Sequence, residues 1–312
     1  MTPFWRRDRH AERRGFLAAR ARILRAVRAW FDDRGFTEAE PAALVAVPGA
    51  EVHVDAFAAD GRYLHTSPEF AMKTLLAAGE ERIFYLGKCW RKGESGPLHA
   101  EEFTILEWYR AHASYECVMQ DCVELAQVAA REAGATALRW KGEICHPFAA
   151  PERLTVRDAF ARHALSPQGG GALSHDEFSR AIVRVEPHLG APALTLLYEY
   201  PISEAALARR CAHDPTVSER FELYACGVEL ANGFGELTDP IEQRARLLEA
   251  MEEKERRYGR RWPIDEDFLA ALAHMPPASG VALGFDRLVM LATGARDIGD
   301  VLWTPPDIRS AR

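Results

Sequence analysis

The sequence lacks the marks of several protein classes. Its six cysteines include no C-x-x-C pair, which leaves structural zinc unsupported, and a chain of 312 residues has no need of a disulfide framework. No stretch approaches the roughly 18 consecutive apolar residues of a membrane span. No apolar run follows the early arginines, as a signal peptide would require. We therefore expect a soluble, reduced, cytoplasmic protein with no membrane partner.

Basic residues are also fewer than acidic residues. The chain has 39 Lys and Arg against 46 Asp and Glu, a net charge of −7. Tight, non-specific binding to a phosphate backbone needs clustered cations, so this balance argues against it. The one basic cluster near the start comprises Arg6, Arg7, Arg9, Arg13 and Arg14. It lies just before the predicted helix, and we interpret it as a surface exposed to solvent.

The hydrophobic pattern predicts a mixed helical and strand domain. Apolar residues at helical spacing from Phe16 to Phe31 predict a helix that Gly35 ends, and further helices are expected near 68–78, 114–133, 175–184 and 240–258. Strands are expected at 83–90, 103–109, 194–200, 221–224, 228–231 and 279–284, and the glycines at 169–171 predict a flexible connection. Strands mostly follow strands, which predicts an α+β fold with a mainly antiparallel sheet flanked by helices.

Charged residues lie on and beside the first strand pair. Arg91 ends one strand and could grip a carboxylate or a phosphate with its planar fork. Phe103, Ile105, Glu107 and Tyr109 share one face of the other strand. A surface hairpin with a charged loop is the alternative. It is weakened because a glutamate buried beside aromatic residues is unfavourable without a partner.

Acidic residues recur on a second hairpin. Glu222 and Glu229 flank a turn and could share a hard divalent cation. Asn232, Phe234 and Glu236 alternate on one face, and an amide, an aromatic ring and a carboxylate suit a ligand that carries an ammonium group. The alternative is a solvent-exposed face with incidental acids. The small neighbouring residues argue against it.

A glycine-punctuated strand precedes the last apolar helix. The segment SGVALGFDRL alternates small with apolar residues, so a planar or phosphorylated ligand could approach its backbone closely. Arg287 at the strand end could then hold phosphate. Tight strand–helix packing with a surface arginine would produce the same pattern.

Together and in this order, these segments resemble the catalytic core of a class II aminoacyl-tRNA synthetase of the lysyl type. FTEAEPAAL resembles motif 1, which implies a homodimer with Pro41 at the interface. CWRKGESGPLHAEEFTILEWYR resembles motif 2, and GVALGFDRL resembles motif 3. TSPEFAMK and VELANGFGELTD are close to lysyl-specific signatures. The resemblance spans about residues 15–303.

The position of motif 1 sharpens this resemblance. Pro41 lies too early for the anticodon-binding domain of lysyl-tRNA synthetases to precede it, so we expect one catalytic domain over 1–312. Such a core resembles the elongation factor P–(R)-β-lysine ligase family. The resemblance implies activation of (R)-β-lysine or lysine as an adenylate and its transfer to a lysine side chain of elongation factor P. It implies ATP and Mg²⁺ as cofactors and makes tRNA an unlikely partner.

The resemblance also implies roles for individual residues. Arg91 and Arg287 are expected to act in catalysis. The ATP site is expected to comprise Arg91, Gly93, Glu94, His99, Phe103, Glu229, Leu230, Gly284 and Arg287. The amino-acid site is expected to comprise Ser67, Pro68, Glu69, Glu107, Tyr109, Asn232, Phe234, Glu236 and Ala282. Glu222 and Glu229 are expected to bind Mg²⁺.

Two positions depart from the patterns of related enzymes. Gly93 stands where motif 2 commonly has a glutamate that contacts adenine, and Glu94 is the nearest acid. Ala282 stands where lysyl-tRNA synthetases have glycine, which fits a β-amino acid. The alternatives are a lysyl ligase for another acceptor, a non-catalytic regulator that binds amino acid or nucleotide, and tRNA aminoacylation. The retained arginines and acids argue against the regulator.

Overall fold

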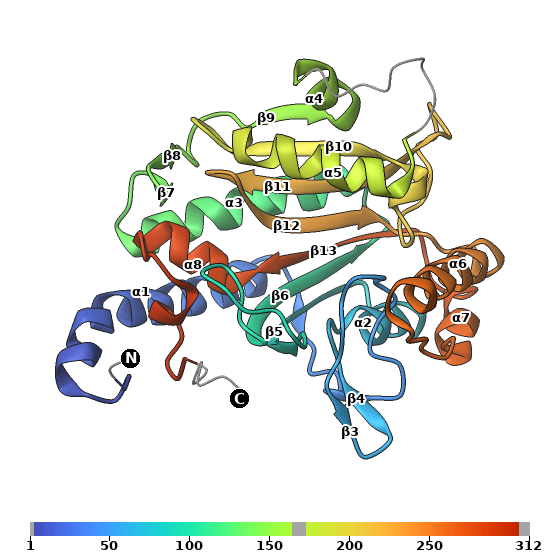
Figure 1. Ribbon diagram of the computed structural model, residues 1–312, viewed down its shortest axis with the longest axis horizontal. Coiled ribbons are helices and arrows are strands. Elements are labelled where there is room, and N and C mark those ends of the chain that lie inside the picture. Colours follow the sequence, from blue (N-terminus) through green and yellow to red (C-terminus); the bar gives the residue numbers. More distant parts are fainter. Residues whose placement is uncertain (1–2, 164–172, 306–312) are drawn as a thin grey trace.

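An eight-stranded sheet forms the centre of the computed structural model, which describes residues 3–163 and 173–305 (Figure 1). Its strand order is β1-β5-β6-β13-β12-β11-β10-β9. The strands span β1 Thr37–Glu38, β5 Arg82–Trp90, β6 Glu102–Ala111, β9 Glu152–Thr155, β10 Thr195–Pro201, β11 Val217–Ala225, β12 Val228–Gly235 and β13 Ala278–Gly284. Only the edge pairs β1–β5 and β9–β10 are parallel. The α+β prediction is confirmed, whereas the predicted connection at 169–171 lies outside the described residues.

Three helices pack on one face of the sheet and enclose the main core. They are α1 (Arg7–Asp32), α3 (Tyr115–Ala133) and α8 (Phe285–Thr293). Phe31 of α1 stacks on Phe84 of β5 with ring centroids 4.4 Å apart, and Trp108 of β6 is fully buried beside them. Aromatic packing of this kind fixes α1 against the middle of the sheet.

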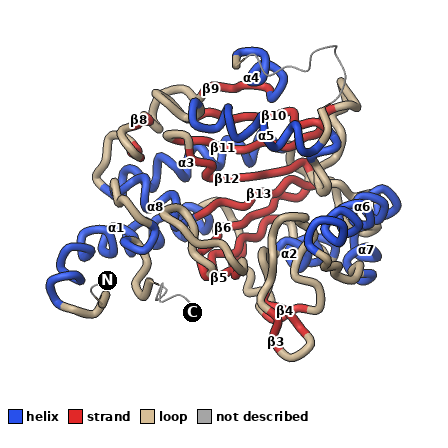
Figure 2. The backbone as a smooth tube through the Cα atoms, in the orientation of Figure 1, coloured by secondary structure: helices blue, strands red, loops and turns tan. Residues whose placement is uncertain are grey.

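The other face is covered at its two ends and left open at its centre. α4 (Val156–Arg162) and α5 (His175–Val185) pack over β9, β10 and β11. α2 (Glu69–Ala77), α6 (Pro240–Tyr258) and α7 (Glu266–Leu272) gather near the other end, where α2 and α7 pack on β5, β6 and β13. Figure 2 shows these two groups of helices on either side of the central strands. A cleft therefore forms over β6, β13, β12 and β11.

The remaining elements are short. β2 (Leu44–Val45), β3 (Ala58–Ala59) and β4 (Arg62–Leu64) make a small sheet, and β7 (Leu138–Trp140) pairs with β8 (Glu143–Cys145). Single 3₁₀ turns occur at Glu186–His188, Ile202–Glu204 and Ile298–Asp300. These short pieces and α4 were not predicted, because segments of two to seven residues carry too little periodicity to be recognised.

Most predicted helices and strands are confirmed, but the interpretation of the early arginines was wrong in part. α1 begins at Arg7, and Arg13 lies inside it with only 1% of its surface exposed. Its guanidinium donates to the backbone carbonyl of Leu302, which ties α1 to the segment after α8. All six cysteine thiols are free. Within the described residues, no helix is long and apolar enough to cross a membrane.

Candidate active site

The open centre of the sheet is a cleft with a cavity volume of about 510 Å³, within the usual range for small-molecule sites. Most of the residues predicted for the ATP site lie on its wall, namely Arg91, Glu94, His99, Phe103, Glu229, Leu230, Gly284 and Arg287. The wall also includes Ser67, Glu69, Glu222, Asn232, Phe234 and Ala282 from the predicted amino-acid and metal sites. Motifs far apart in the sequence therefore meet in one cavity, because β6, β13, β12 and β11 are neighbours in the sheet.

Arg91 stands at the mouth of the motif 2 hairpin. Its Nε donates to the carbonyl of Thr66 at 3.3 Å, and its guanidinium lies 5.2 Å from the centre of the Phe103 ring. A flat cation beside a flat aromatic ring offers a stacking surface to a purine and a charged fork to phosphate or carboxylate.

Arg287 is held on the opposite side of the cleft by three contacts. It donates to the carbonyls of Leu98 and Glu229 at 3.3 and 3.0 Å, and it lies 2.7 Å from Nε2 of His99. Burial, followed by the charge of Arg287, lowers the pKa of His99. A neutral ring nitrogen can accept from the guanidinium, so His99 fixes its direction.

The buried start of α8 supports Arg287 from below. Asp286 forms an ion pair with Arg20 of α1 and accepts from the backbone N–H of Thr104 at 2.7 Å. Arg20 also donates to the Thr104 hydroxyl at 2.8 Å. The ion pair ties motif 3 to motif 2 and to α1, which positions Arg287 with little freedom.

The loop at Gly93 and Glu94 differs from the motif 2 pattern of related enzymes. Gly93 has a φ of +82°, which favours glycine, and its N–H donates to Oε1 of Glu101 at 2.7 Å. The turn places the Glu94 side chain on the cleft wall and keeps Gly93 off it. An acid is therefore available at this corner one residue later than the motif leads one to expect.

Glu222 and Glu229 both face the cleft but in different surroundings. Glu222 accepts from Tyr200 and Tyr224 at 2.6 and 2.5 Å and from Arg220 at 2.8 Å. Burial and then the charge of Glu222 raise the pKa of Glu229 to about 7. Two ionised carboxylates repel each other, and a divalent cation between them would offset that repulsion. The pair is therefore suitable for binding such a cation. Among the described residues, no group of three or more His, Cys, Asp or Glu could hold a metal, so further ligands would come from phosphate oxygens or water.

The predicted amino-acid site is divided into two layers. Ser67 and Glu69 lie on the cleft wall, whereas Glu107, Tyr109 and Glu236 are buried and absent from it. The Ser67 hydroxyl donates to Glu107 at 2.7 Å, and the Tyr109 hydroxyl donates to Glu107 at 2.6 Å. Burial raises the pKa of Glu107 to about 8. The deeper layer therefore continues directly from the cleft and holds a carboxyl group that is largely protonated at neutral pH.

Pro68, like Gly93, was predicted to contact a ligand but is absent from the cleft wall. It occupies the N-cap position of α2 and lines a small separate cavity rather than the cleft. Its fixed φ helps to begin the helix that carries Glu69. Pro68 therefore lies between two residues of the cleft wall, Ser67 and Glu69, and its contact with the amino acid stays a prediction.

Sequence reasoning missed two basic residues of the site. Lys73 is fully buried, with its Nζ 2.5 Å from Glu69 and 2.6 Å from Glu236. Arg220 lies on the cleft wall and pairs with Glu222. For Lys73 a signal was present, because it follows Glu69 by four residues, the spacing of a helical ion pair.

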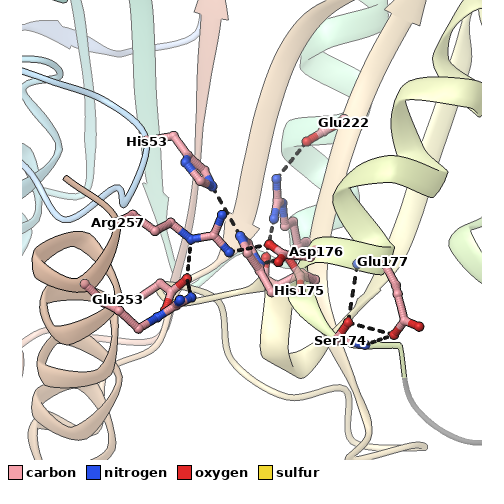
Figure 3. Close-up of polar contacts among 11 residues, drawn as sticks. His53, Ser174, His175, Asp176, Glu177, Glu222, Glu253 and Arg257 are labelled. Carbon is pink, nitrogen blue, oxygen red and sulfur yellow. Dashed lines mark hydrogen bonds and ion pairs between the residues drawn. The ribbon is translucent and has the colours of Figure 1, made fainter.

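Three elements meet beside the cleft in a group of polar contacts. His53, from the loop before β3, points its Nε2 at Nε2 of His175 at the start of α5, 3.2 Å away (Figure 3). The other nitrogen of His53 contacts the Tyr258 hydroxyl at 2.7 Å, and that of His175 contacts Glu204 at 2.8 Å. His53 also lines the cleft. We call the contact between His53 and His175 the histidine clasp.

Lysine and arginine side chains of α6 complete this junction. Arg257 forms ion pairs with Asp176 of α5 and with Glu253 of its own helix (Figure 3). Lys254 donates to the carbonyls of Glu51, Val52 and Val54. The loop that carries His53 is thus held by α6 on one side and by α5 on the other.

Comparisons with known proteins agree with this geometry. A family model described as tRNA synthetases class II (D, K and N) matches residues 4–307. The chain is 40% identical over 304 residues to elongation factor P–(R)-β-lysine ligase of Pectobacterium carotovorum, covering 92% of this chain and 93% of that protein. It is 40% identical over 305 residues to the ligase of the same name from Photorhabdus laumondii, with coverage of 92% and 93%. The corresponding protein of Yersinia enterocolitica is 38% identical over 307 residues, with coverage of 93% and 94%.

The antiparallel sheet, the cleft over its centre and the match over most of the chain define a class II aminoacyl-tRNA synthetase fold. Within that class, the chain belongs to the family of the elongation factor P–(R)-β-lysine ligases. The recognition made from the sequence motifs is confirmed.

Proposed function

We propose that this protein is an ATP-dependent ligase that activates (R)-β-lysine and transfers it to a lysine side chain of elongation factor P. The observation that carries the proposal is that a single cleft joins Arg91, Phe103 and Arg287 to a buried layer of carboxylates. The first group suits a nucleotide, and the second suits an amino acid with a distal ammonium group. The relatives carry the name of this activity and match nearly the full chain.

In the first step, a carboxylate oxygen of the amino acid attacks the α-phosphorus of ATP, and pyrophosphate leaves. Arg91 can contact the carboxylate and the α-phosphate together, which offsets their repulsion and the charge that develops between them. Arg287, which contacts His99 and two carbonyls, would hold the outer phosphates. Positioning and charge account for the acceleration, and no covalent enzyme intermediate is required.

In the second step, the neutral amine of the acceptor lysine attacks the adenylate carbonyl, an amide bond forms, and AMP leaves. The amine must lose a proton before or during attack. Burial raises the pKa of Glu229 to about 7, and Glu229 lines the cleft. It is therefore a candidate proton acceptor when it is not engaged with a cation.

Mg²⁺ is part of the proposal. Glu229 and Glu222 would hold the ion, which supplies neutralisation of phosphate charge. Arg220 and two tyrosine hydroxyls already occupy three of the acceptor positions on Glu222, so Glu229 would be its main carboxylate ligand. The remaining parts of the proposal are a single catalytic domain, a homodimer, a cytoplasmic location and no role for tRNA.

One experiment tests the activity directly. The purified protein is mixed with ATP, Mg²⁺ and either lysine or (R)-β-lysine, together with elongation factor P, and the acceptor is weighed by mass spectrometry. We expect a mass gain of one β-lysyl group. No gain with either isomer would overturn the proposal. In a parallel reaction with tRNA in place of elongation factor P, a gain on tRNA alone would establish tRNA aminoacylation instead.

The choice between the isomers is expected to depend on Ala282. This residue lines the cleft and pairs with Asn232 on β12 and Glu107 on β6. A difference of one methyl group typically discriminates by about 1–3 kcal/mol. Ala282→Gly should therefore raise activation of α-lysine relative to β-lysine in a pyrophosphate-exchange assay, with the protein still folded. An unchanged ratio would remove Ala282 from the specificity argument.

A further inference from the structure

Lys73 is a buried cation that the proposed chemistry does not use. It lies on α2 one turn after Glu69, and its side chain has no exposed surface. Its Nζ is 2.5 Å from Oε1 of Glu69 and 2.6 Å from Oε2 of Glu236. One ammonium group therefore bridges two of the acids assigned to the substrate.

The bridge leaves one oxygen of Glu236 available. Among the described residues, neither buried oxygen of Glu236 has a hydrogen-bond partner, but Oε2 lies at ion-pair distance from Lys73, whereas Oε1 has no such neighbour. It lies beside the space that a side chain at position 280 would fill, since a Cβ on Gly280 would be 2.6 Å from it. A buried carboxylate oxygen without a donor is unfavourable, which indicates that a ligand supplies the donor.

Lys73 reduces the negative charge that the three acids reach when a doubly cationic ligand ionises them, beside the smaller effects of Arg209 on Glu236 and of Glu51 on Glu69. Glu69, Glu107 and Glu236 can carry three negative charges, and Lys73 removes one of them. The remainder matches the two ammonium groups of lysine or β-lysine, whose carboxylate is directed to Arg91. Burial would lower the pKa of Lys73, but its pairs with Glu236 and Glu69 outweigh burial and raise it, so it stays charged.

We propose that Lys73 is a positioning residue that sets the charge and the geometry of the amino-acid site, so that it takes a substrate with two ammonium groups. It holds one oxygen of Glu69 and one of Glu236 and leaves their other oxygens to the substrate. The inference rests on the proposed function and adds to it the residue that selects a doubly cationic amino acid.

Removal of Lys73 should change the protonation of Glu69 and Glu236. Without the bridging ammonium, Glu69 and Glu236 repel each other in a dry site, and one of them keeps a proton. A substrate with two ammonium groups must then displace that proton as well as the one on Glu107. Binding becomes weaker near neutral pH and more dependent on pH.

The test compares Lys73→Met with Lys73→Arg and with Lys88→Met, which removes a lysine from the half-exposed ion pair with Glu102. Pyrophosphate exchange gives the KM of lysine and of β-lysine from pH 6.5 to 8.

We expect Lys73→Met to raise these KM values by about 10- to 100-fold with little change in the KM of ATP. The logarithm of KM should fall with pH more steeply between pH 7 and 8 than in the unchanged protein, because loss of the ammonium raises the pKa of Glu69 and Glu236 further. Lys73→Arg should restore the slope, and Lys88→Met should match the unchanged protein.

Equal slopes for Lys73→Met and the unchanged protein would overturn the proposal, because a purely structural role lowers affinity by the same factor at every pH. If Lys73→Met does not fold, Lys73→Gln provides the same comparison with a polar, uncharged side chain.

A ligand-free measurement separates this inference from the proposed function. The difference in Tm between the unchanged protein and Lys73→Met should widen from pH 5 to pH 8, because acids with a raised pKa in the folded state lose stability as pH rises. A constant difference would contradict the role of Lys73 whatever the substrate is. Absence of exchange with either lysine isomer in the unchanged protein would instead count against the proposed function alone.

Discussion

At position 280, a missing side chain keeps the floor of the amino-acid site open. A Cβ on Gly280 would lie 2.2 Å from the Tyr109 ring and 2.6 Å from Glu236, both of which belong to the buried layer. Real Cβ atoms do not approach other atoms so closely, so the ring and the carboxylate would have to move.

Gly280→Ala should therefore raise the KM of the amino acid by at least about tenfold, while the KM of ATP changes little. Pyrophosphate exchange at varied concentrations of each substrate measures both values. Gly15→Ala is a matched control, because Gly15 lies in α1 with nothing within 4 Å of an added Cβ. Equal effects of the two substitutions would contradict the assigned position of Gly280.

Glu107 links substrate binding to stability. Its folded pKa of about 8 lies well above the usual value for a glutamate, chiefly because the carboxyl group is buried. The folded state therefore keeps a proton that the unfolded chain releases. The stability that this proton provides is fully present below about pH 4 and is lost as pH rises toward 8.

Glu107→Gln removes that loss and keeps a polar group beside Ser67 and Tyr109. The ligand-free variant should be more stable than the unchanged protein at pH 8, on the order of 2 kcal/mol, with a smaller difference at pH 5. Denaturant titrations at both pH values measure this. The variant should also bind lysine more weakly, because an amide cannot neutralise an ammonium group. If the variant is no more stable than the unchanged protein at pH 8, burial of Glu107 has little effect on the free energy of unfolding.

At the scale of elements, the histidine clasp joins α5 to the loop that carries His53. The charged and polar groups around it are Tyr258, Glu204, Arg257, Lys254 and Glu253. Burial, then His175 and then Arg257 lower the pKa of His53, so the folded state favours its neutral form. The clasp is therefore present above about pH 6.5 and weakens as pH falls below it. A positive charge on the buried His53 ring would be unfavourable beside Arg257 and Lys254.

Backbone hydrogen exchange of residues 49–56 should be faster at pH 5.5 than at pH 7.5, after correction for the intrinsic rates. The change should be at least severalfold. His175→Phe should exchange fast at both pH values, because the partner of His53 is gone. Protection that is independent of pH in the unchanged protein would show that Lys254 and its neighbours hold the loop without the clasp.

At the scale of the whole molecule, the resemblance of residues 36–44 to motif 1 predicts a dimer. Pro41 is partly exposed, and Leu44 of β2 exposes 41% of its surface. Sedimentation velocity at micromolar concentration should give twice the 34.9 kDa of one chain. Leu44→Asp should shift the distribution toward the monomer, whereas Ile241→Asp, at an exposed position on α6, should not. A monomer at all concentrations would contradict the prediction.

The sequence by itself determined the fold class, the family and most of the cleft wall. Alternation along β6, β12 and β13 assigns side chains to faces, because successive residues of a strand point to opposite sides. The resemblance to known motifs then predicted Arg91, Phe103, Glu229 and Arg287 as site residues, and all four line the cleft.

Tertiary structure alone decided which charges meet. Lys73 and Glu236 are far apart in the sequence and form an ion pair because α2 packs on β6, near Glu236 at the end of β12. Arg13 is buried because the segment after α8 covers it, and the pKa of Glu107 is raised because packing removes its water. Burial and the distance between charges depend on how distant segments pack, and no periodicity within one segment records them.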